Sequence, residues 1–284
     1  MPNLKEIRNR IGSVSSTMQI TSAMKMVSAA KLKKAQDAIT AMRPYSDKLT
    51  QMLVDLSSSI DFENIYLKPR KVENLLVVCI TSNRGLCGAF NSNVIKKCFD
   101  LADNPEGNIS FFCIGKKGAD ILSKNYNIID SNNDIFDDLS FENISLIAEV
   151  LMKKFVDKEF DRIQIVYNKF KNAATQVVMQ EQYLPIENTI SKNNHQEFAD
   201  YIFEPSKVEI ISELIPKSLK TQLFKSVRDS YASEHGARMT AMHKATDNAT
   251  ELRDQLKLTY NKARQAAITN EILEIVGGAE ALNS

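Results

Sequence analysis

The chain has 284 residues, of which 43% are hydrophobic and 25% charged, and its formal net charge is +1. This composition is typical of a folded protein with a sizeable core, and it excludes a disordered or a collagen-like polymer. No apolar run approaches the roughly 20 residues that span a bilayer, and the first residues, MPNLKEIRNRI, carry no apolar signal core. We therefore expect any membrane contact to be made through a partner.

The four cysteines, at positions 79, 87, 98 and 113, form no CxxC pair. Cys79 and Cys113 lie inside the apolar runs LLVVCI and ISFFCI. Cysteines in such runs are typical of buried, reduced thiols. We expect a reducing compartment and no structural disulfide.

Residues 1–58 are predicted to form one long helix. Glycine is absent between Gly12 and Gly85, and the one proline well inside the segment is Pro44. Because proline removes a backbone hydrogen bond and clashes with the preceding turn, we expect a kink or a break near Arg43.

Apolar residues of this helix recur at steps of three and four, which is the spacing of a coiled-coil seam. They are Ile7, Ile11, Val14, Met18, Leu32, Ala35, Ile39, Met42, Leu49, Leu53 and Leu56. The seam is continuous only if polar residues fill the missing turns, namely Thr21, Lys25, Ser28 and Ser46. Two interpretations of Thr21–Ser28 stay open: these residues face solvent, or something other than the partner helix encloses the hairpin there.

Residues 207–284 are predicted to form the second long helix. Its seam is predicted at Met242, Ala245, Ala249, Leu252, Leu256, Thr259, Ala263, Ala266, Asn270 and Leu273. At 1.5 Å per residue, a helix of about 70 residues would be about 100 Å long, which exceeds the diameter of a domain of this size. Its apolar end favours a sheath of other subunits, and this end comprises Ile268, Ile272, Leu273, Ile275 and Val276.

Residues 72–205 alternate short apolar runs with amphipathic segments. Strands are predicted at 75–80, 109–114, 161–169 and 175–185, helices at 92–102, after 115 and at 144–155, and a loop at 188–197. This alternation predicts a parallel or mixed sheet with helices on its faces. The expected fold class is therefore α/β, a Rossmann-like domain inserted into a long antiparallel coiled coil of the N- and C-terminal helices.

No set of residues predicts catalysis. The glycines of NRGLCGAF and IGKKGA follow strands, but neither segment fits the G-x-G-x-x-G or the G-x-x-x-x-G-K-[ST] pattern of a nucleotide site. Cys87 would need a neighbouring base to act as a nucleophile, and no histidine is predicted near it. His235 and His243 are too far apart on one helix to share a metal ion. We expect structural turns, and neither a cofactor nor a metal.

The two ends resemble one known family. LKEIRNRIGSVSSTMQITSAMKMVSAAKLKKAQ at the start and SEHGARMTAMHKATDNATELRDQLKLTYNKARQAAITNEILEIVGGAEAL at the end closely resemble the gamma subunit of F-type ATP synthases. SNRGLCGAFN resembles that family's signature loop, although Asn83 stands where aspartate is usual and Ala89 where glycine is usual. Two other hypotheses are a small nucleotide-binding or cysteine enzyme with a helical dimerisation arm, and a coiled-coil scaffold without a motor. The missing phosphate motifs disfavour the first, and the end sequences disfavour the second.

The resemblance implies a central rotor shaft. The coiled coil would thread a hexamer of alternating alpha and beta subunits, and the α/β body would stand on the membrane c-ring with the epsilon subunit. Ion-driven rotation of the ring would then drive the conformational cycle of the catalytic beta subunits. The resemblance implies no catalysis by this chain, no nucleic-acid partner, and a location at the cytoplasmic face of a bacterial inner membrane.

The resemblance also implies specific contact residues. Contacts with the beta subunits would fall on Met24, Lys25, Arg238, Arg264, Gln265 and Thr269. Contacts with the membrane ring would fall on Tyr201, Phe203 and Glu204, within DYIFEPS.

Overall fold

The computed structural model describes residues 4–57, 65–103, 105–186 and 206–283. The chain forms two compact units: Met1–Ser28 with Met239–Ser284, and Ala29–Arg238. The long helices α1 (Leu4–Ser57) and α5 (Lys207–Asn283) each run through both units. The predicted loop 188–197 lies outside the described residues.

The larger unit contains one five-stranded mixed sheet in the order β3-β2-β1-β4-β5. Its strands are β1 (Asn74–Ile80), β2 (Asn108–Ile114), β3 (Ile128–Asn132), β4 (Arg162–Phe170) and β5 (Gln176–Leu184). The first four lie parallel to their neighbours, and β5 pairs antiparallel with β4. The predicted α/β class is confirmed, but β3 was missed, because its sequence IIDSN is short and only two of its five residues are apolar.

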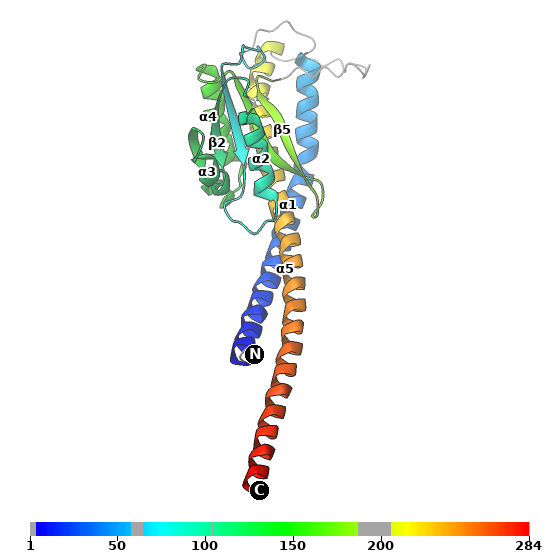
Figure 1. Cartoon of the computed structure of the whole chain (residues 1–284). Helices are drawn as coiled ribbons and strands as arrows, with labels where there is room; N and C mark the ends of the chain where they lie inside the picture. The colour runs from blue at the N-terminus through cyan, green and yellow to red at the C-terminus, as the bar shows by residue number, and fades with distance from the viewer. Residues whose placement is uncertain (1–3, 58–64, 104, 187–205, 284) are drawn as a thin grey trace. The chain divides into compact units, whose positions relative to one another are not determined.

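Helices cover both faces of this sheet (Figure 1). Alternate residues of a strand point to opposite faces, so β1 sends Leu75 and Val77 to one face and Leu76 and Val78 to the other. The first face packs against α2 (Phe90–Asp103) and α3 (Lys116–Leu122). The second packs against α4 (Phe141–Val156) and the start of α5. A short 3-10 helix, η1 (Asp134–Phe136), lies between β3 and α4 in the chain.

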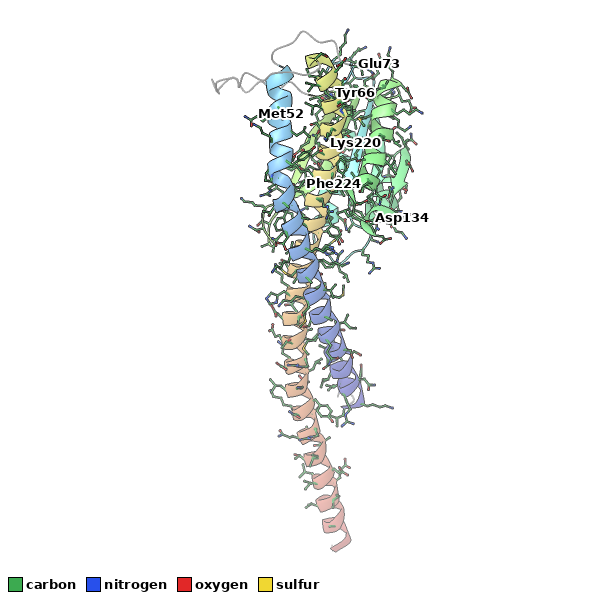
Figure 2. The ribbon with its side chains drawn as sticks, turned by 180° about the vertical axis from the view of Figure 1, so that it is seen from behind. Met52, Tyr66, Glu73, Asp134, Lys220 and Phe224 are labelled. Carbon is green, nitrogen blue, oxygen red and sulfur yellow. The ribbon has the colours of Figure 1, made fainter. Side chains whose placement is uncertain are left out.

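The second half of α1 and the first part of α5 belong to the same unit and lie side by side (Figures 1 and 2). In α1, Ala35, Ile39, Ser46 and Leu49 are all buried. The helix continues through Pro44, so of the predicted kink or break near Arg43 the break is wrong and the kink stays a prediction. Burial on both sides of the proline offsets the loss of a backbone hydrogen bond.

The smaller unit is an antiparallel pair of helices. The Thr246 hydroxyl donates to Thr21 Oγ1 at 2.8 Å, the Arg253 guanidinium approaches Met18 Sδ at 3.5 Å, and Arg8 lies 6.0 Å from the Tyr260 ring centroid. As the residue number decreases along α1, from Thr21 to Arg8, the number of the contacted residue increases along α5, from Thr246 to Tyr260.

The predicted seam of α1 is confirmed from Ile7 to Leu49, including its polar positions, and its last two members, Leu53 and Leu56, are not among the side chains that the structure describes. Thr21 is 8% exposed and Ser28 is 3% exposed. The first interpretation, that these residues face solvent, is therefore wrong for Thr21 and Ser28, and the second stays a prediction. Thr21 bonds to Thr246 of the partner helix, and the Ser28 hydroxyl donates to the Met24 carbonyl at 2.8 Å. Hydroxyl groups satisfied in this way are tolerated inside a helix pair.

The predicted seam of α5 is wrong at four positions, two of which, Asn270 and Leu273, lie in the fully exposed last stretch of the helix. Leu252 and Thr259 are exposed, and the half-buried positions are Arg253 and Tyr260 instead. Leu256, Ala263 and Ala266 are half-buried as predicted, so only the order of the steps of three and four differs at these two turns.

Candidate interaction surfaces

The loop between β1 and α2 is held by polar contacts at its start. The Ser82 amide donates to Asn91 Oδ1 at 3.0 Å, and its hydroxyl donates to the Arg84 carbonyl at 2.7 Å. Asn91 Nδ2 also donates to Cys87 Sγ at 3.2 Å. The Asn83 side-chain amide donates to the Asn133 carbonyl at 2.6 Å. An ionised aspartate, the residue usual at this position, has no donor and could not form this bond.

Arg238 of α5 fastens the same loop to the helix. Its guanidinium pairs with Glu234 at 2.6 Å and donates to the carbonyl oxygens of Arg84 and Gly85 at 3.1 and 3.3 Å. Arg238 is 8% exposed, so this predicted beta-subunit contact is buried and bonded within the chain. Burial raises the pKa of Glu234, against the opposing effect of Arg238.

Cys87 and His235 lie in this region without forming a catalytic pair. Burial raises the pKa of the Cys87 thiol, which keeps it protonated at neutral pH and therefore weakly nucleophilic. Burial, with Arg238 and Lys31, lowers the pKa of His235 to about 3. All four cysteines are buried free thiols, and the described residues contain no cluster of three or more potential metal ligands.

The second glycine turn, after β2, packs against Thr81 at the end of β1. A Cβ on Gly115 would lie 2.1 Å from the Thr81 carbonyl oxygen, and Gly115 has a φ of 103°. The Gly118 amide donates to Thr81 Oγ1 at 2.8 Å. This turn therefore packs α3 against the end of β1.

The predicted contacts near the end of α5 are exposed. Arg264, Gln265 and Thr269 lie within one and a half turns, and the Thr269 hydroxyl donates to the Gln265 carbonyl at 2.9 Å. Every residue from 267 to 279 is exposed, including apolar side chains. Those apolar residues are Ile268, Ile272, Leu273, Ile275 and Val276, with exposed fractions of 48–66%.

The predicted contacts on α1 are half-buried. Met24 and Lys25 lie at the edge of the helix pair. The sequence interpretation missed the exposed apolar residues beside them, Ile20, Met26 and Val27, at 61%, 68% and 58% exposure. Their position outside the seam spacing was the signal that could have found them. The predicted ring contacts Tyr201, Phe203 and Glu204 lie outside the described residues.

None of the described helices is long and apolar enough to cross a membrane. This finding agrees with the absence of a long apolar run in the sequence.

A family model described as ATP synthase matches residues 3–282. An ATP synthase gamma chain of Flavobacterium psychrophilum is 67% identical over 285 residues, which cover 99% of each chain. The gamma chain of Christiangramia forsetii is 66% identical over 287 residues, covering 100% of both chains. The gamma chain of Geobacter sp. strain M21 is 42% identical over 286 residues, covering 99% of both.

Two solved structures have a similar fold. A chain of the Euglena gracilis mitochondrial ATP synthase OSCP/F1/c-ring, in rotational state 3, matches with a TM-score of 0.74 and 26% identity, covering 98% of this chain and 94% of that one. A chain of the Tetrahymena thermophila mitochondrial ATP synthase central stalk and c-ring matches with a TM-score of 0.63 and 26% identity, covering 80% of this chain and 99% of that one.

Proposed function

Because the chain belongs to the ATP synthase gamma-chain family, we propose that the exposed end of α5 turns inside a ring of alternating alpha and beta subunits and contacts the beta subunits. The chain is the central rotor shaft of an ATP synthase and is not itself a catalytic subunit.

One observation carries the proposal. Residues 267–279 of α5 expose every side chain, although five of these are large and apolar. A contiguous apolar surface of this kind is typical of an interaction site rather than of a free helix end. A sleeve of partner subunits would bury it.

The contact residues follow from exposure and chemistry. Arg264 and Gln265 present adjacent donors on α5, and Thr269 lies one turn beyond. Met24 and Lys25 on α1 adjoin the exposed residues Met26 and Val27. Arg238 would act indirectly, because its guanidinium is already bonded to the carbonyls of the β1–α2 loop. We propose that the β1–α2 loop, rather than Arg238 itself, contacts the beta subunits at this position.

The mechanism is a bias of conformational equilibria. A shaft with different side chains on each side offers each of three surrounding catalytic subunits a different contact at any angle. A contact that is stronger in one conformation of a subunit shifts that subunit toward it, and by linkage nucleotide binding shifts the preferred angle of the shaft. A charged hydrogen bond such as one from Arg264 contributes about 1.5–3 kcal/mol to such a difference.

The α/β body would form the base of the stalk. There it would contact the c-ring through the segment of Tyr201, Phe203 and Glu204, together with the epsilon subunit. We propose a peripheral location at the cytoplasmic face of a bacterial inner membrane. Membrane contact would go through these partners only.

The test is reconstitution of this chain with alpha and beta subunits of the same enzyme. Replacing Arg264 and Gln265 by alanine should lower the ATPase rate of the complex by about tenfold or more, or lower its yield, because about 1.4 kcal/mol corresponds to tenfold. The matched control is Lys124→Ala with Asn125→Ala, an exposed basic and amide pair on the α/β body. Unchanged rate and yield in the Arg264 and Gln265 variant would remove these residues from the contact surface.

A further inference from the structure

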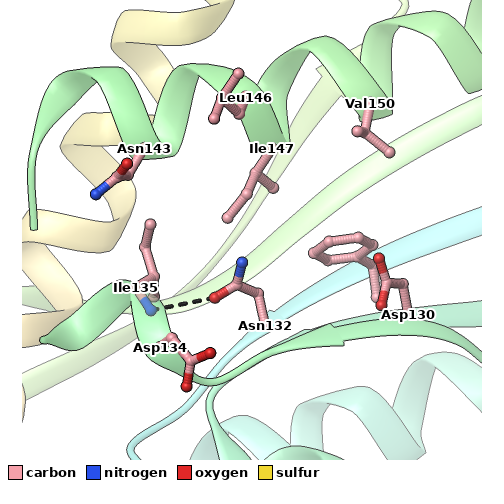
Figure 3. Close-up of a pocket in the computed structure, with 9 residues that line it drawn as sticks. Asp130, Asn132, Asp134, Ile135, Asn143, Leu146, Ile147 and Val150 are labelled. Atoms are coloured by element: carbon pink, nitrogen blue, oxygen red, sulfur yellow. Dashed lines mark hydrogen bonds between the residues drawn. The ribbon is translucent and has the colours of Figure 1, made fainter. Parts of the chain in front are cut away.

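A groove lies between β3, η1 and α4, within the larger unit, with a volume of about 390 Å³ (Figure 3). Its floor is apolar, because Phe112, Ile135 and Ile147 line it and are each at most 5% exposed. Its rim on α4 carries Leu146 and Val150, one turn apart, at 62% and 44% exposure. We call this feature the α4–β3 groove.

The opposite rim is acidic. Asp130 and Asp134 line the groove and are exposed, and no ion pair to either is found within the described residues. Asn132 Oδ1 accepts from the Ile135 amide at 3.1 Å, which fixes the turn that carries Asp134 (Figure 3). The rim is therefore a built feature of the fold rather than a loose loop.

The surrounding sequence contains no cation to neutralise this rim. Between Lys124 and Lys153 there is no lysine or arginine. The acidic residues of this stretch are Asp130, Asp134, Asp137, Asp138, Glu142 and Glu149. Glu149 is paired with Lys220 of α5 at 2.5 Å, on the side of the molecule seen in Figure 2. The other acids of this stretch form no ion pair within the described residues.

The groove also adjoins the edge of the sheet. β3 is the first strand in the order β3-β2-β1-β4-β5, and among the described residues no strand pairs with its outer side. An exposed strand edge is a template for an added strand, with main-chain bonds giving affinity and adjacent pockets giving specificity.

We propose that the α4–β3 groove binds an extended, lysine-bearing segment of another stalk protein. The segment lies along β3, the aliphatic stem of its lysine covers Leu146 and Val150, and its ammonium group lies near Asp130 or Asp134. Lysine suits both halves of the site, since it combines an apolar stem with a charged head. The inference rests on the proposed function in one respect, because it takes the partner from the assembled enzyme.

Other occupants fit less well. A nucleotide, a phosphate or an anionic lipid surface would be repelled by the acidic rim. A divalent cation needs more carboxylates than the groove offers, and the described residues contain no cluster of three metal ligands. A purely apolar peptide would desolvate Asp130 and Asp134 without compensation.

The test uses the intact ATP synthase, purified and treated with a carbodiimide that couples a carboxylate directly to an amine in contact with it. The expected product joins Asp130 or Asp134 to a lysine of another subunit, identified by mass spectrometry. Asp130→Asn with Asp134→Asn should abolish it. The control Asp100→Asn with Asp103→Asn, an exposed acidic pair on α2, should retain it. Leu146→Gln, at an exposed position, should lower the yield because the lysine stem loses an apolar contact.

A second readout uses carbodiimide with glycine ethyl ester as a free amine. Asp130 and Asp134 should be labelled in the isolated chain and protected in the intact enzyme. Equal labelling in both, or coupling only to lysines of this same chain or of a second copy, would overturn the inference. If alpha and beta subunits co-purify with normal ATPase while these acids stay labelled, only this inference fails. If no complex forms, the proposed function fails and takes this inference with it.

Discussion

Replacing Arg238 by alanine would leave the Glu234 carboxylate without its partner in a site that water hardly reaches. The two side chains are 9% and 10% exposed and 2.6 Å apart. Removing one member of a buried ion pair typically costs about 3–5 kcal/mol, because the remaining charge is uncompensated. The carbonyls of Arg84 and Gly85 would also lose a charged donor. We therefore expect the free energy of unfolding to fall by about 3–5 kcal/mol at pH 7.

The cost should depend on pH in a defined direction. Burial already raises the pKa of Glu234, and removal of Arg238 would raise it further. A raised carboxyl pKa means that the folded state binds the proton more tightly than the unfolded chain. The loss of stability caused by the unpaired carboxylate therefore shrinks as the pH falls toward the pKa of Glu234 in the unfolded chain. The destabilisation should accordingly be smaller at pH 5 than at pH 7.

The assay is guanidinium unfolding followed by circular dichroism, with hydrogen exchange of residues 82–91. Arg238→Ala should lower the midpoint and speed exchange in that loop. Glu234→Leu with Arg238→Met should recover most of the loss, since replacing both members of a buried pair is often neutral. The control is Lys71→Ala, because Lys71 and its partner Glu73 are both solvent-exposed and the loss of such a pair should cost at most about 1 kcal/mol. A loss below about 0.5 kcal/mol for Arg238→Ala, the range of ordinary surface changes, would refute the reasoning.

Two further predictions concern the body and its junction with α5. Gly115→Ala should destabilise the chain by about 3 kcal/mol or more, because the new methyl group would lie 2.1 Å from the Thr81 carbonyl oxygen. The control is Gly85→Ala, whose methyl group would meet nothing within 4 Å. Equal urea midpoints for the two variants would contradict this prediction. Burial lowers the pKa of His235 to about 3, so below pH 6.5 the unfolded chain binds a proton that the folded chain lacks, and stability should fall by about 1.4 kcal/mol per pH unit. His235→Asn should flatten this slope in urea titrations between pH 7 and pH 5, and an unchanged slope would exclude His235 as its source.

The seam of α1 was predictable because it depends on spacing alone. A period of 3.5 placed Thr21, Ser28 and Ser46 in the seam, and all three are buried. What the spacing could not provide was their partners. Thr21 is satisfied by Thr246, which lies 225 positions away, and no local pattern indicates such a bond.

Arg238 illustrates the limit for the candidate site. The family resemblance assigns it to a partner subunit, and no pattern in its sequence neighbours indicates burial. Its burial follows from the β1–α2 loop, which approaches α5 from more than 150 positions away. Arg264 and Gln265 are exposed between the half-buried seam residues Ala263 and Ala266, so seam spacing alone separates them from the paired face.

The sequence by itself determined the helical periods, the strand runs and the family, since each of these depends on residues close together in the chain or on long matching segments. Only the tertiary structure decided that α1 continues through Pro44, that IIDSN forms the edge strand, and that Arg253 and Tyr260 replace Leu252 and Thr259 in the seam. These outcomes depend on how burial and hydrogen bonds offset a local preference, and those contributions come from residues distant in the chain.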